Sequence, residues 1–404
     1  MRTAKHMRYN ITMSAMKKLS DIAPLSEKHH SEKKQHHSKE AATNNKLPRS
    51  SNDKTHSWTK RKTIIIAGAS LLVLAIAAIL IMLFSGHSNF TSGTVKNPDT
   101  ANKTNVKYYS PLTGREVADE ASTKHPVLAV MIENSPDARP QSGLKDAGVV
   151  FEAVAEGGIT RFIALYQDTE PSLIGPVRSV RPYYLEWAAA FSPAIAHVGG
   201  SPQALTMIRS GNYGVDLDQF ANGSSYWRAK DRKAPHNVYT DYSNLTKLAS
   251  ARGKSSSEFT GLARQSATGT SETATTSATS INLAVSTGQF AVSYKYDATS
   301  HTYLRYLGGV AHIDREKGQI APDVVIAIHV SQTLQSDRTH NTITTAGSGE
   351  CYVFQNGTVI KGTWHKDAAT AQLKFLDESN QEIKLARGQT WITAVQNGRS
   401  ITWQ

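Results

Sequence analysis

The chain has 404 residues, a formal net charge of +12 and a single cysteine, Cys351. Residues 1–62 hold 15 Lys and Arg against 5 Asp and Glu, whereas residues 85–404 hold 30 against 28. A nucleic-acid-binding domain normally concentrates positive charge on one surface, and the portion beyond residue 84 has almost no excess charge to concentrate. Nucleic acid is therefore excluded as the main partner, and one cysteine excludes an intramolecular disulfide.

An uncharged apolar run at residues 63–84 predicts a single transmembrane helix. The run consists mainly of Ile, Leu, Ala and Val, and as a helix it spans about 33 Å, enough to cross the hydrocarbon core of a bilayer. Lys60, Arg61 and Lys62 directly precede it, so the positive-inside rule places the N-terminus in the cytoplasm and residues 85–404 outside. Residues 1–62 are expected to be a disordered basic tail, and the Ser/Thr/Asn-rich residues 85–107 a spacer.

Residues 108–250 read as a first folded domain with mixed secondary structure. Apolar runs at 126–133, 149–155, 160–167 and 194–198 predict strands, with a tight turn at Gly157-Gly158. A helix is expected at 182–191, and Ser201-Pro202 supplies an N-cap and a first-turn proline for another at 203–209. Strands mixed with helices indicate an α/β or α+β domain.

The second half of the chain has a different character. Residues 251–284 include a Ser/Thr/Ala-rich stretch without large aliphatic or aromatic side chains at 263–280, which predicts a flexible linker. Residues 285–404 contain short alternating runs, among them 290–296, 303–307, 324–329, 352–355, 358–364, 373–376, 382–385, 390–395 and 400–403. Asn356-Gly357 is a strong hairpin signal between two of these runs. A mainly antiparallel β domain is expected, and Cys351 falls within one of its strands, where burial is the expected reason for it.

The first domain carries a set of polar residues in turn-like segments that suits an anionic ligand. Arginine's planar fork matches phosphate and carboxylate, and loops often carry function. The candidate ligand-binding residues are Asp137, Arg139, Glu156, Arg161, Arg178, Arg181, His197, Arg228 and His236. The same domain also holds enough acidic residues to pair these arginines structurally, so the alternative of a salt-bridge network stays open.

Other chemistries have weaker support in the sequence. Glu133, Glu152 and Glu156 offer carboxylates for acid–base catalysis, but no spacing brings them together. The segment from His197 to Ser201 is not a nucleophile elbow, and Ser201 already serves as a helix cap. The metal-protease, Cys-x-x-Cys, P-loop and Rossmann fingerprints do not occur in the sequence. Accordingly, neither a cofactor nor a metal is expected, and no catalytic residue is assigned.

Several segments of this chain resemble the YerB-like bacterial envelope lipoproteins. They are 130–134 (VMIEN), 139–147 (RPQSGLKDA), 156–162 (EGGITRF), 175–183 (GPVRSVRPY) and 197–201 (HVGGS), followed by 312–314 (HID), 347–349 (GSG), 362–364 (GTW) and 388–392 (GQTWI). The resemblance implies a two-domain envelope protein, and the family is typically anchored through a lipidated N-terminal cysteine. Here no cysteine lies near the apolar run, so we expect the transmembrane helix to replace the lipid.

A fainter likeness is to the LytR-CpsA-Psr family. It lies in the order of an Asp-x-Arg loop, paired strands, an arginine-bearing segment, an apolar strand and Gly-Gly before a helix. That family transfers phosphate-linked glycans to the cell wall, and Asp137, Arg139, Arg178 and Arg181 would fill comparable places. Its Pro-Arg-Asp motif is missing, because Ser179 follows Arg178 and Pro182 follows Arg181, which weakens any transfer of its chemistry.

The sequence thus favours a membrane-anchored, extracytoplasmic protein that binds an anionic cell-wall glycan or a lipid-linked phosphate ligand. Two alternatives remain at this point. One is a phosphodiester transferase or hydrolase acting on lipid-linked glycans, and the other is an architectural scaffold of the envelope.

Overall fold

The computed structural model describes residues 106–266 and 276–404. The predicted tail, transmembrane helix and spacer at 1–62, 63–84 and 85–107 lie outside these residues, except for the last two residues of the spacer. Within the described ranges, no helix is both long and apolar enough to cross a membrane.

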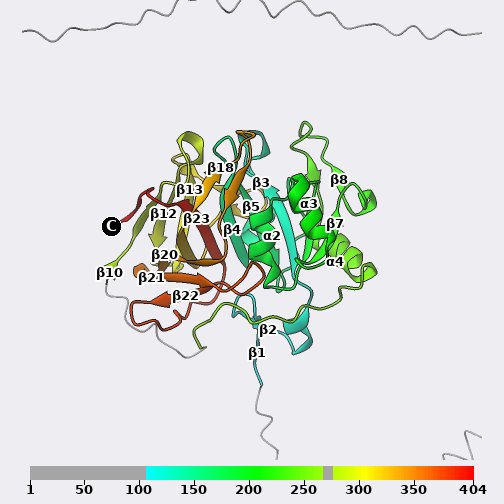
Figure 1. Cartoon of the computed structure of the whole chain (residues 1–404). Coiled ribbons are helices and arrows are strands. Elements are labelled where there is room, and N and C mark those ends of the chain that lie inside the picture. The colour runs from blue at the N-terminus through cyan, green and yellow to red at the C-terminus, as the bar shows by residue number, and fades with distance from the viewer. Residues whose placement is uncertain (1–105, 267–275) are drawn as a thin grey trace, which may run out of the picture. The chain divides into compact units, whose positions relative to one another are not determined.

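A mixed sheet of 11 strands forms the centre of the described fold, which is mostly β with few helices (Figure 1). Its order is β10-β21-β20-β17-β23-β4-β5-β3-β6-β7, and β22 pairs with β21. In that order the strands are β10 (Thr276–Ser277), β21 (Thr358–Lys366), β20 (Gly347–Gln355), β17 (Val324–Val330), β23 (Thr390–Gln396), β4 (Val149–Glu156), β5 (Ile159–Tyr166), β3 (Leu128–Glu133), β6 (Ala194–His197), β7 (Val215–Asp218) and β22 (Lys374–Asp377).

This sheet crosses the boundary between the two predicted domains. Strand β23 lies between β17 and β4 and runs parallel to both, with Trp391 opposite Val150 and Val325. Phe151 and Trp391 are almost fully buried, as expected for parallel strands, which are normally covered on both faces. The two halves of the sequence are therefore joined by backbone hydrogen bonds of a shared sheet.

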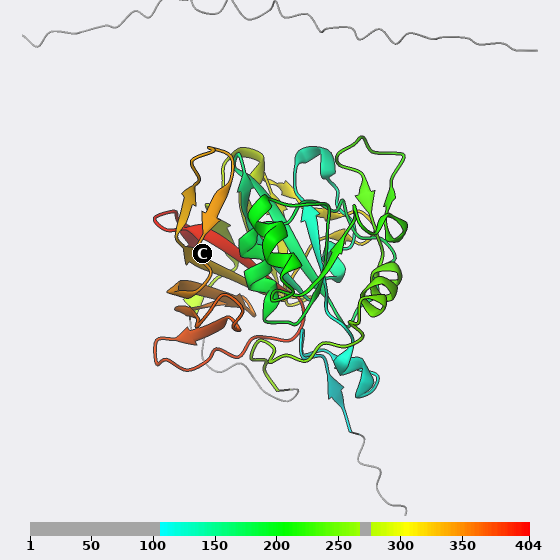
Figure 2. The ribbon, with the colours of Figure 1, turned by 45° about the vertical axis from the view of Figure 1, so that its right-hand side comes forward.

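Helices cover both faces of the sheet near β3, β5 and β6 (Figures 1 and 2). On one face, α2 (Pro182–Ala189) and α3 (Pro202–Arg209) pack against alternate residues such as Met131 and Ile163. On the other face, α4 (Tyr242–Ala251) packs against the intervening residues such as Val130 and Ala164. Alternation along the strands thus gives two separate cores, as the pleat requires.

A second sheet of five strands covers the remaining part of the α4 face. Its strands are β14 (Val310–Ala311), β13 (Thr302–Leu307), β12 (Val292–Asp297), β11 (Ser280–Leu283) and β24 (Ile401–Trp403). Tyr294 and Ile281 of this sheet share a core with Val325 and Phe354 of the main sheet. Small two-stranded pairs complete the fold, namely β1 (Tyr108–Tyr109) with β2 (Glu116–Val117), β8 (Trp227–Arg228) with β9 (Val238–Tyr239), β15 (Ile313–Asp314) with β16 (Gly318–Gln319), and β18 (Gln332–Leu334) with β19 (Asn341–Ile343).

Most predicted elements in both halves are confirmed. Gly157 and Gly158 form the turn between β4 and β5 with φ of +56° and +81°, which glycine adopts without steric cost. The Ser201 side chain caps α3 by accepting a hydrogen bond from the Ala204 amide. Cys351 is buried, as expected, and burial raises the pKa of its thiol to about 12. The strand predicted at 382–385 is wrong, because this segment makes only single bridges at Glu382 and Leu385.

Both ends of the predicted linker at 251–284 belong to the packed fold. The Ser257 hydroxyl accepts a hydrogen bond from the Val127 amide at 2.9 Å and donates to the Ser192 carbonyl at 2.6 Å. Leu262 is buried, and Arg264 donates to the carbonyls of Leu112 and Ala386. At the other end, β10 and β11 are strands, whereas residues 267–275 lie outside the described ranges. Small polar side chains in this segment predict a flexible linker because they cannot form a core. In the structure, Ser257 is nevertheless held in place by hydrogen bonds.

A closed ring of buried polar side chains also links the two halves. Its members, in order, are Arg305, His312, Gln141, Asn134, Thr160 and Glu152. Each of the first five side chains donates a hydrogen bond to the next one. The ring closes at Glu152, whose Oε2 accepts from Arg305 Nη2 at 2.8 Å. His312 accepts from Arg305 through Nδ1, so its proton lies on Nε2, which faces Gln141. Burial, reinforced by the charge of Arg305, holds the pKa of His312 well below its usual value, which keeps its imidazole neutral.

Candidate functional site

Three parallel strands of the main sheet end at a common edge. Strands β3, β6 and β7 are mutually parallel neighbours, so Glu133, His197 and Asp218 mark their carboxyl ends. Ligands of open α/β sheets bind outside this edge, where the loops after the strands converge. This edge is therefore the expected place for a ligand site.

A cleft of about 530 Å³ opens at this edge. Its lining residues come from the segment before α2, the β6–α3 loop, the end of α3, the end of β7 and the β8–β9 hairpin. They are Arg178, Ser179, Val198, Gly199, Gly200, Leu205, Arg209, Asp218, Phe220, Arg228, Pro235 and Val238. The exposed Phe220 ring lies beside the glycine loop and adds an apolar surface to the cleft.

The glycine loop at the mouth of the cleft depends on the absence of side chains. Gly199 has φ of +59°, and a Cβ there would lie 3.2 Å from the Phe220 ring. A Cβ on Gly200 would lie 2.8 Å from a Val180 methyl group. Both glycines therefore allow β6 to turn tightly into α3 and bring the backbone to the surface of the cleft.

Three arginines line the cleft. Arg178 Nε lies 3.2 Å from Glu133 Oε1, and Arg228 donates to the Asn237 amide oxygen at 2.8 Å. Among the described residues, no carboxylate lies within ion-pair distance of Arg209 or Arg228. Asp218 also lines the cleft, but its Oδ1 already accepts hydrogen bonds from the amides of Gly199 and Phe220. The cleft therefore carries positive charge that its carboxylates do not neutralise.

A polar cluster around the buried carboxylate of Glu133 lies next to Arg178. Glu133 Oε1 is 3.0 Å from His236 Nδ1 and accepts from the Ser135 hydroxyl at 2.9 Å. Ser135 Oγ is also 3.2 Å from His236 Nδ1, and Asp137 lies 3.9 Å from His236 Nε2. Glu133 Oε2 is buried without a hydrogen-bond partner in the described structure, so the cluster retains an unused acceptor.

Two of the predicted arginines are paired by one carboxylate away from the cleft lining. Arg161 Nη2 donates to Glu156 Oε2 at 2.7 Å, and Arg181 binds Glu156 Oε1. Both arginines also donate to carbonyls, those of Ser179 and Val180 respectively. Burial lowers the pKa of Arg181, with Arg161 acting in the same direction. This set has the geometry of a structural salt-bridge network, the alternative left open by the sequence.

Arg139 and His197 also have structural partners. Arg139 donates to Asn134 and to the Gln289 carbonyl, and its guanidinium lies 4.9 Å from the centre of the Phe290 ring. His197 is fully buried, with Nε2 3.0 Å from Asp216 Oδ1 and Nδ1 2.9 Å from the Gly199 carbonyl. Burial raises the pKa of Asp216, but the hydrogen bond and charge of His197, together with the Asp218 amide and the charge of Arg209, outweigh burial and lower it overall.

The nine predicted site residues therefore separate into groups. Only Arg178 and Arg228 line the cleft, and His236 and Asp137 belong to the cluster behind Arg178. The sequence reading did not include Arg209, because an arginine in the last turn of a helix is favourable there for the helix dipole alone. The sequence suggests Glu133 only as one of three carboxylates for acid–base catalysis, and it gives no signal for Ser135.

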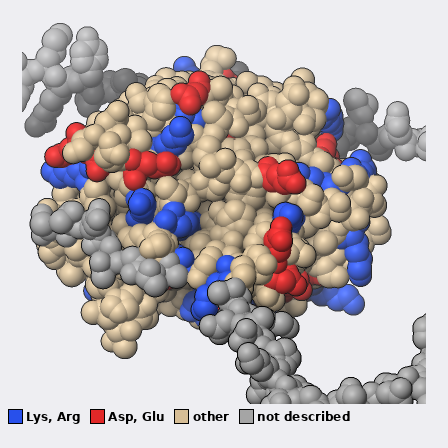
Figure 3. All heavy atoms as spheres, turned by 90° about the horizontal axis from the view of Figure 1, so that it is seen from below, with Lys and Arg blue, Asp and Glu red and all other residues tan. Residues whose placement is uncertain are grey.

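The surface charge elsewhere is mixed. On the face seen in Figure 3, Lys and Arg lie interspersed with Asp and Glu among the described residues. Within the described ranges, no group of three or more His, Cys, Asp or Glu side chains is placed to hold a metal ion. The cleft itself combines three arginines with apolar side chains such as Phe220 and Leu205.

Comparison with known proteins relates both halves of the chain to one family. Residues 112–255 match the model described as "Protein of unknown function (DUF3048) N-terminal domain", and residues 281–392 match the corresponding C-terminal domain. The chain is 35% identical to the "Putative lipoprotein YerB" of Bacillus subtilis (strain 168) over 309 residues, which cover 74% of this chain and 88% of the relative. The crystal structure of the Bacillus subtilis YerB protein superposes with a TM-score of 0.66 at 31% identity, covering 73% of this chain and 100% of that one.

Proposed function

The chain belongs to the YerB family, defined by its two DUF3048 domains, and from this premise we propose that it is a membrane-anchored envelope protein that binds an anionic cell-wall ligand. The ligand is a phosphate-bearing or acidic glycan. Its anionic group binds in the cleft lined by Arg178, Arg209 and Arg228. The single observation that carries the proposal is that, among the described residues, no carboxylate lies within ion-pair distance of Arg209 or Arg228.

The composition of the cleft supports an anion rather than a neutral ligand. Guanidinium groups bind phosphate and carboxylate through parallel N–H donors, and three of them face one cavity. The cleft lies at the carboxyl ends of parallel strands, the usual ligand position in such sheets. Arg161 and Arg181, by contrast, are held in structural ion pairs with Glu156.

The proposed location rests on the apolar run and on the family. The relative is named a lipoprotein, which indicates membrane attachment for that protein. In this chain, residues 63–84 offer an uncharged segment of membrane-spanning length, flanked by Lys60, Arg61 and Lys62. We place residues 85–404 on the extracytoplasmic side, where a wall ligand is accessible.

Calorimetric titration of the purified full-length protein with pyrophosphate tests the cleft. We expect Arg209→Ala and Arg228→Ala to weaken binding by about tenfold each, because each removes a charge-assisted contact worth roughly 1.5–3 kcal/mol. Lys374→Ala is the matched control, because it removes one exposed positive charge from β22, at the opposite end of the sheet from β7. Equal affinities for all four proteins would contradict the proposal.

The Glu133 cluster favours a second candidate function, a phosphodiester transferase or hydrolase. A serine hydroxyl, a histidine and a buried carboxylate lie within 3.2 Å of one another beside Arg178. Such a set can take a proton from an attacking hydroxyl or water. The faint likeness to the LytR-CpsA-Psr family points the same way, although Arg139 and Arg181, two of its comparable residues, are bound to other groups here.

Turnover distinguishes the two functions. Cleavage of a phosphate-linked glycan by the purified protein, lost in Glu133→Gln and His236→Asn but retained in Glu156→Gln among variants that remain folded, would establish the enzyme. Binding of the same glycan without any cleavage would favour the binding protein.

A further inference from the structure

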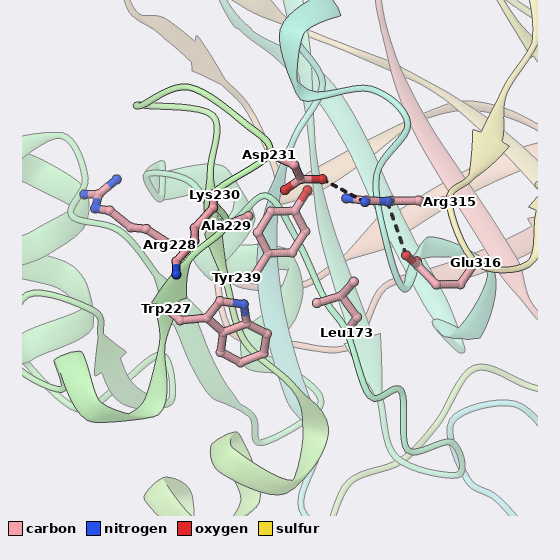
Figure 4. A pocket seen from close by; sticks show the side chains of 9 residues that line it. All are labelled: Leu173, Trp227, Arg228, Ala229, Lys230, Asp231, Tyr239, Arg315 and Glu316. Carbon is pink, nitrogen blue, oxygen red and sulfur yellow. Dashed lines mark hydrogen bonds and ion pairs between the residues drawn. The ribbon is translucent and has the colours of Figure 1, made fainter.

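A second pocket lies beside the β8–β9 hairpin. It has a volume of about 390 Å³ and is formed by residues of both halves of the chain (Figure 4). Its lining residues are Leu173, Trp227, Arg228, Ala229, Lys230, Asp231, Tyr239, Arg315 and Glu316. We propose that this pocket binds an uncharged sugar ring of the glycan whose anionic group occupies the arginine cleft, an inference that rests on the proposed function.

The apolar side of the pocket is aromatic. Trp227 is 38% exposed and is one of the few large apolar side chains at the surface of the described structure. Figure 4 shows its indole ring beside the Tyr239 ring, with Leu173 across from it. A pyranose ring has a face of C–H bonds, which packs well on an aromatic face because that face carries partial negative charge. An exposed tryptophan in a concave site therefore suits a sugar better than it suits solvent.

The opposite side of the pocket offers paired hydrogen-bonding groups. Arg315 Nη2 donates to Asp231 Oδ2 at 2.8 Å, and Arg315 Nε lies 3.7 Å from Glu316 Oε1. Tyr239 is 1% exposed, and its buried hydroxyl has no hydrogen-bond partner in the described structure. In Figure 4 this hydroxyl points toward Asp231 and Arg315. Adjacent sugar hydroxyls both donate and accept, so they match the exposed carboxylate of Asp231 and guanidinium of Arg315 placed together.

The charge of this pocket differs from that of the cleft. Apart from Arg228, which also lines the cleft, Lys230 and Arg315 are matched in number by Asp231 and Glu316, and Arg315 is held by both acids. A phosphate group would meet these two carboxylates, whereas a neutral sugar would bind to them through its hydroxyls. The pocket therefore favours the uncharged part of a ligand.

Arg228 connects the two sites, since it lines both the cleft and the pocket. Figure 4 shows its guanidinium directed away from the Trp227 and Tyr239 rings. A ligand with a sugar on Trp227 and an anionic substituent beside Arg228 would thus contact both sites at once. Joining two modest contacts in one molecule raises the overall affinity without any new interaction.

The test uses neutral trisaccharides with the full-length protein. Tri-N-acetylglucosamine, cellotriose and maltotriose are titrated by calorimetry, and pyrophosphate is titrated in parallel. We expect at least one trisaccharide to bind, and Trp227→Ala to weaken it by about tenfold or more, as removal of a central aromatic contact does. Leu334→Ala, at another exposed apolar residue, should leave it unchanged.

The two titrations test the sugar pocket and the arginine cleft independently. Trp227→Ala should keep the pyrophosphate affinity of the unchanged protein, and Arg209→Ala should keep its trisaccharide affinity. If the unchanged protein binds none of the three trisaccharides, or if folded Trp227→Ala binds them equally well, the sugar pocket is overturned. If the unchanged protein binds a trisaccharide but not pyrophosphate, the arginine cleft is contradicted as an anion site and the sugar pocket is supported.

Discussion

Arg305 and Glu152 form an ion pair of 2.8 Å in which both side chains are fully buried. Arg305 comes from β13 in the C-terminal half and Glu152 from β4 in the N-terminal half. The guanidinium also lies 4.3 Å from the centre of the Trp391 ring, and Trp391 donates its indole N–H to Glu152. The two halves are thus joined by a charge pair whose remaining polar atoms are satisfied by neighbours.

Breaking this pair should destabilise the protein strongly. Arg305→Met leaves the Glu152 carboxylate buried and uncompensated, which typically costs about 3–5 kcal/mol. Denaturant unfolding of the purified protein measures the change. Lys107→Met, which breaks the exposed pair with Glu116, serves as the control and should have a far smaller effect. Similar losses in the two variants would show that the buried pair adds little.

His312 should make the protein sensitive to acid. Its pKa in the folded protein is well below 6.5, so the unfolded chain takes up the proton first as the pH falls. The unfolding free energy should therefore decrease below about pH 6.5, by at most roughly 1.4 kcal/mol per pH unit from this group. His312→Gln should be less stable at pH 7.5 but should lose less stability between pH 6.5 and 5. His365→Gln, at an exposed histidine, should keep the slope of the unchanged protein.

The arginines paired with Glu156 should affect stability and not ligand affinity. Arg161→Ala and Arg181→Ala each leave part of the buried network unsatisfied, at a cost of about 1–3 kcal/mol. Their pyrophosphate affinities, measured where each variant is folded, should remain within about twofold of the unchanged protein. A tenfold loss of affinity in either variant would indicate that the anion binds to Arg161 and Arg181 beside Glu156 and not in the cleft.

The segment predicted as a linker should respond to substitution as a packed segment does. A Cβ on Gly261 would lie 1.9 Å from the Pro111 carbonyl oxygen, and this backbone atom cannot move aside easily. Gly261→Ala should therefore lower the unfolding free energy by about 1–3 kcal/mol. At Gly223 an added Cβ would meet nothing within 4 Å, so Gly223→Ala is the matched control and should be close to neutral.

Membrane attachment should depend on the apolar run. Leu74 lies in the middle of residues 63–84, and an arginine at the centre of a membrane helix costs about 2.5–3.5 kcal/mol of insertion free energy. Fractionation of cells should find the unchanged protein and Leu74→Ala in the membrane pellet, with Leu74→Arg partly released. Full retention of a doubly charged variant, Leu74→Arg with Ala78→Arg, would show that attachment has another cause.

The local elements of the fold could be predicted from the sequence because their signals are local. Apolar runs such as that of β4, the Gly157-Gly158 turn and the Ser201 cap each depend on a few adjacent residues. The parallel pairing of β23 with β4 could not be predicted, because the paired residues are separated by more than 200 positions. Continuous apolar runs buried on both faces are compatible with several neighbours.

The sequence predicts a class of ligand but does not identify which arginines are free to bind it. Arginines beside Gly, Pro and Ser predict an anionic ligand, yet Arg161 and Arg181 pair with Glu156 of the same chain. Which arginine is paired depends on side-chain packing across the sheet, which a linear sequence does not show. Arg209 was missed because its position in α3 has an ordinary explanation by itself. Only its orientation beside Arg178 and Arg228 suggests a further role.

The most direct measurement is a difference electron-density map from crystals of the protein soaked with pyrophosphate. We expect density in the cleft, in contact with the guanidinium groups of Arg178, Arg209 and Arg228. Density at any other place with the cleft vacant, or an unoccupied cleft at saturating pyrophosphate, would contradict the proposed anion site.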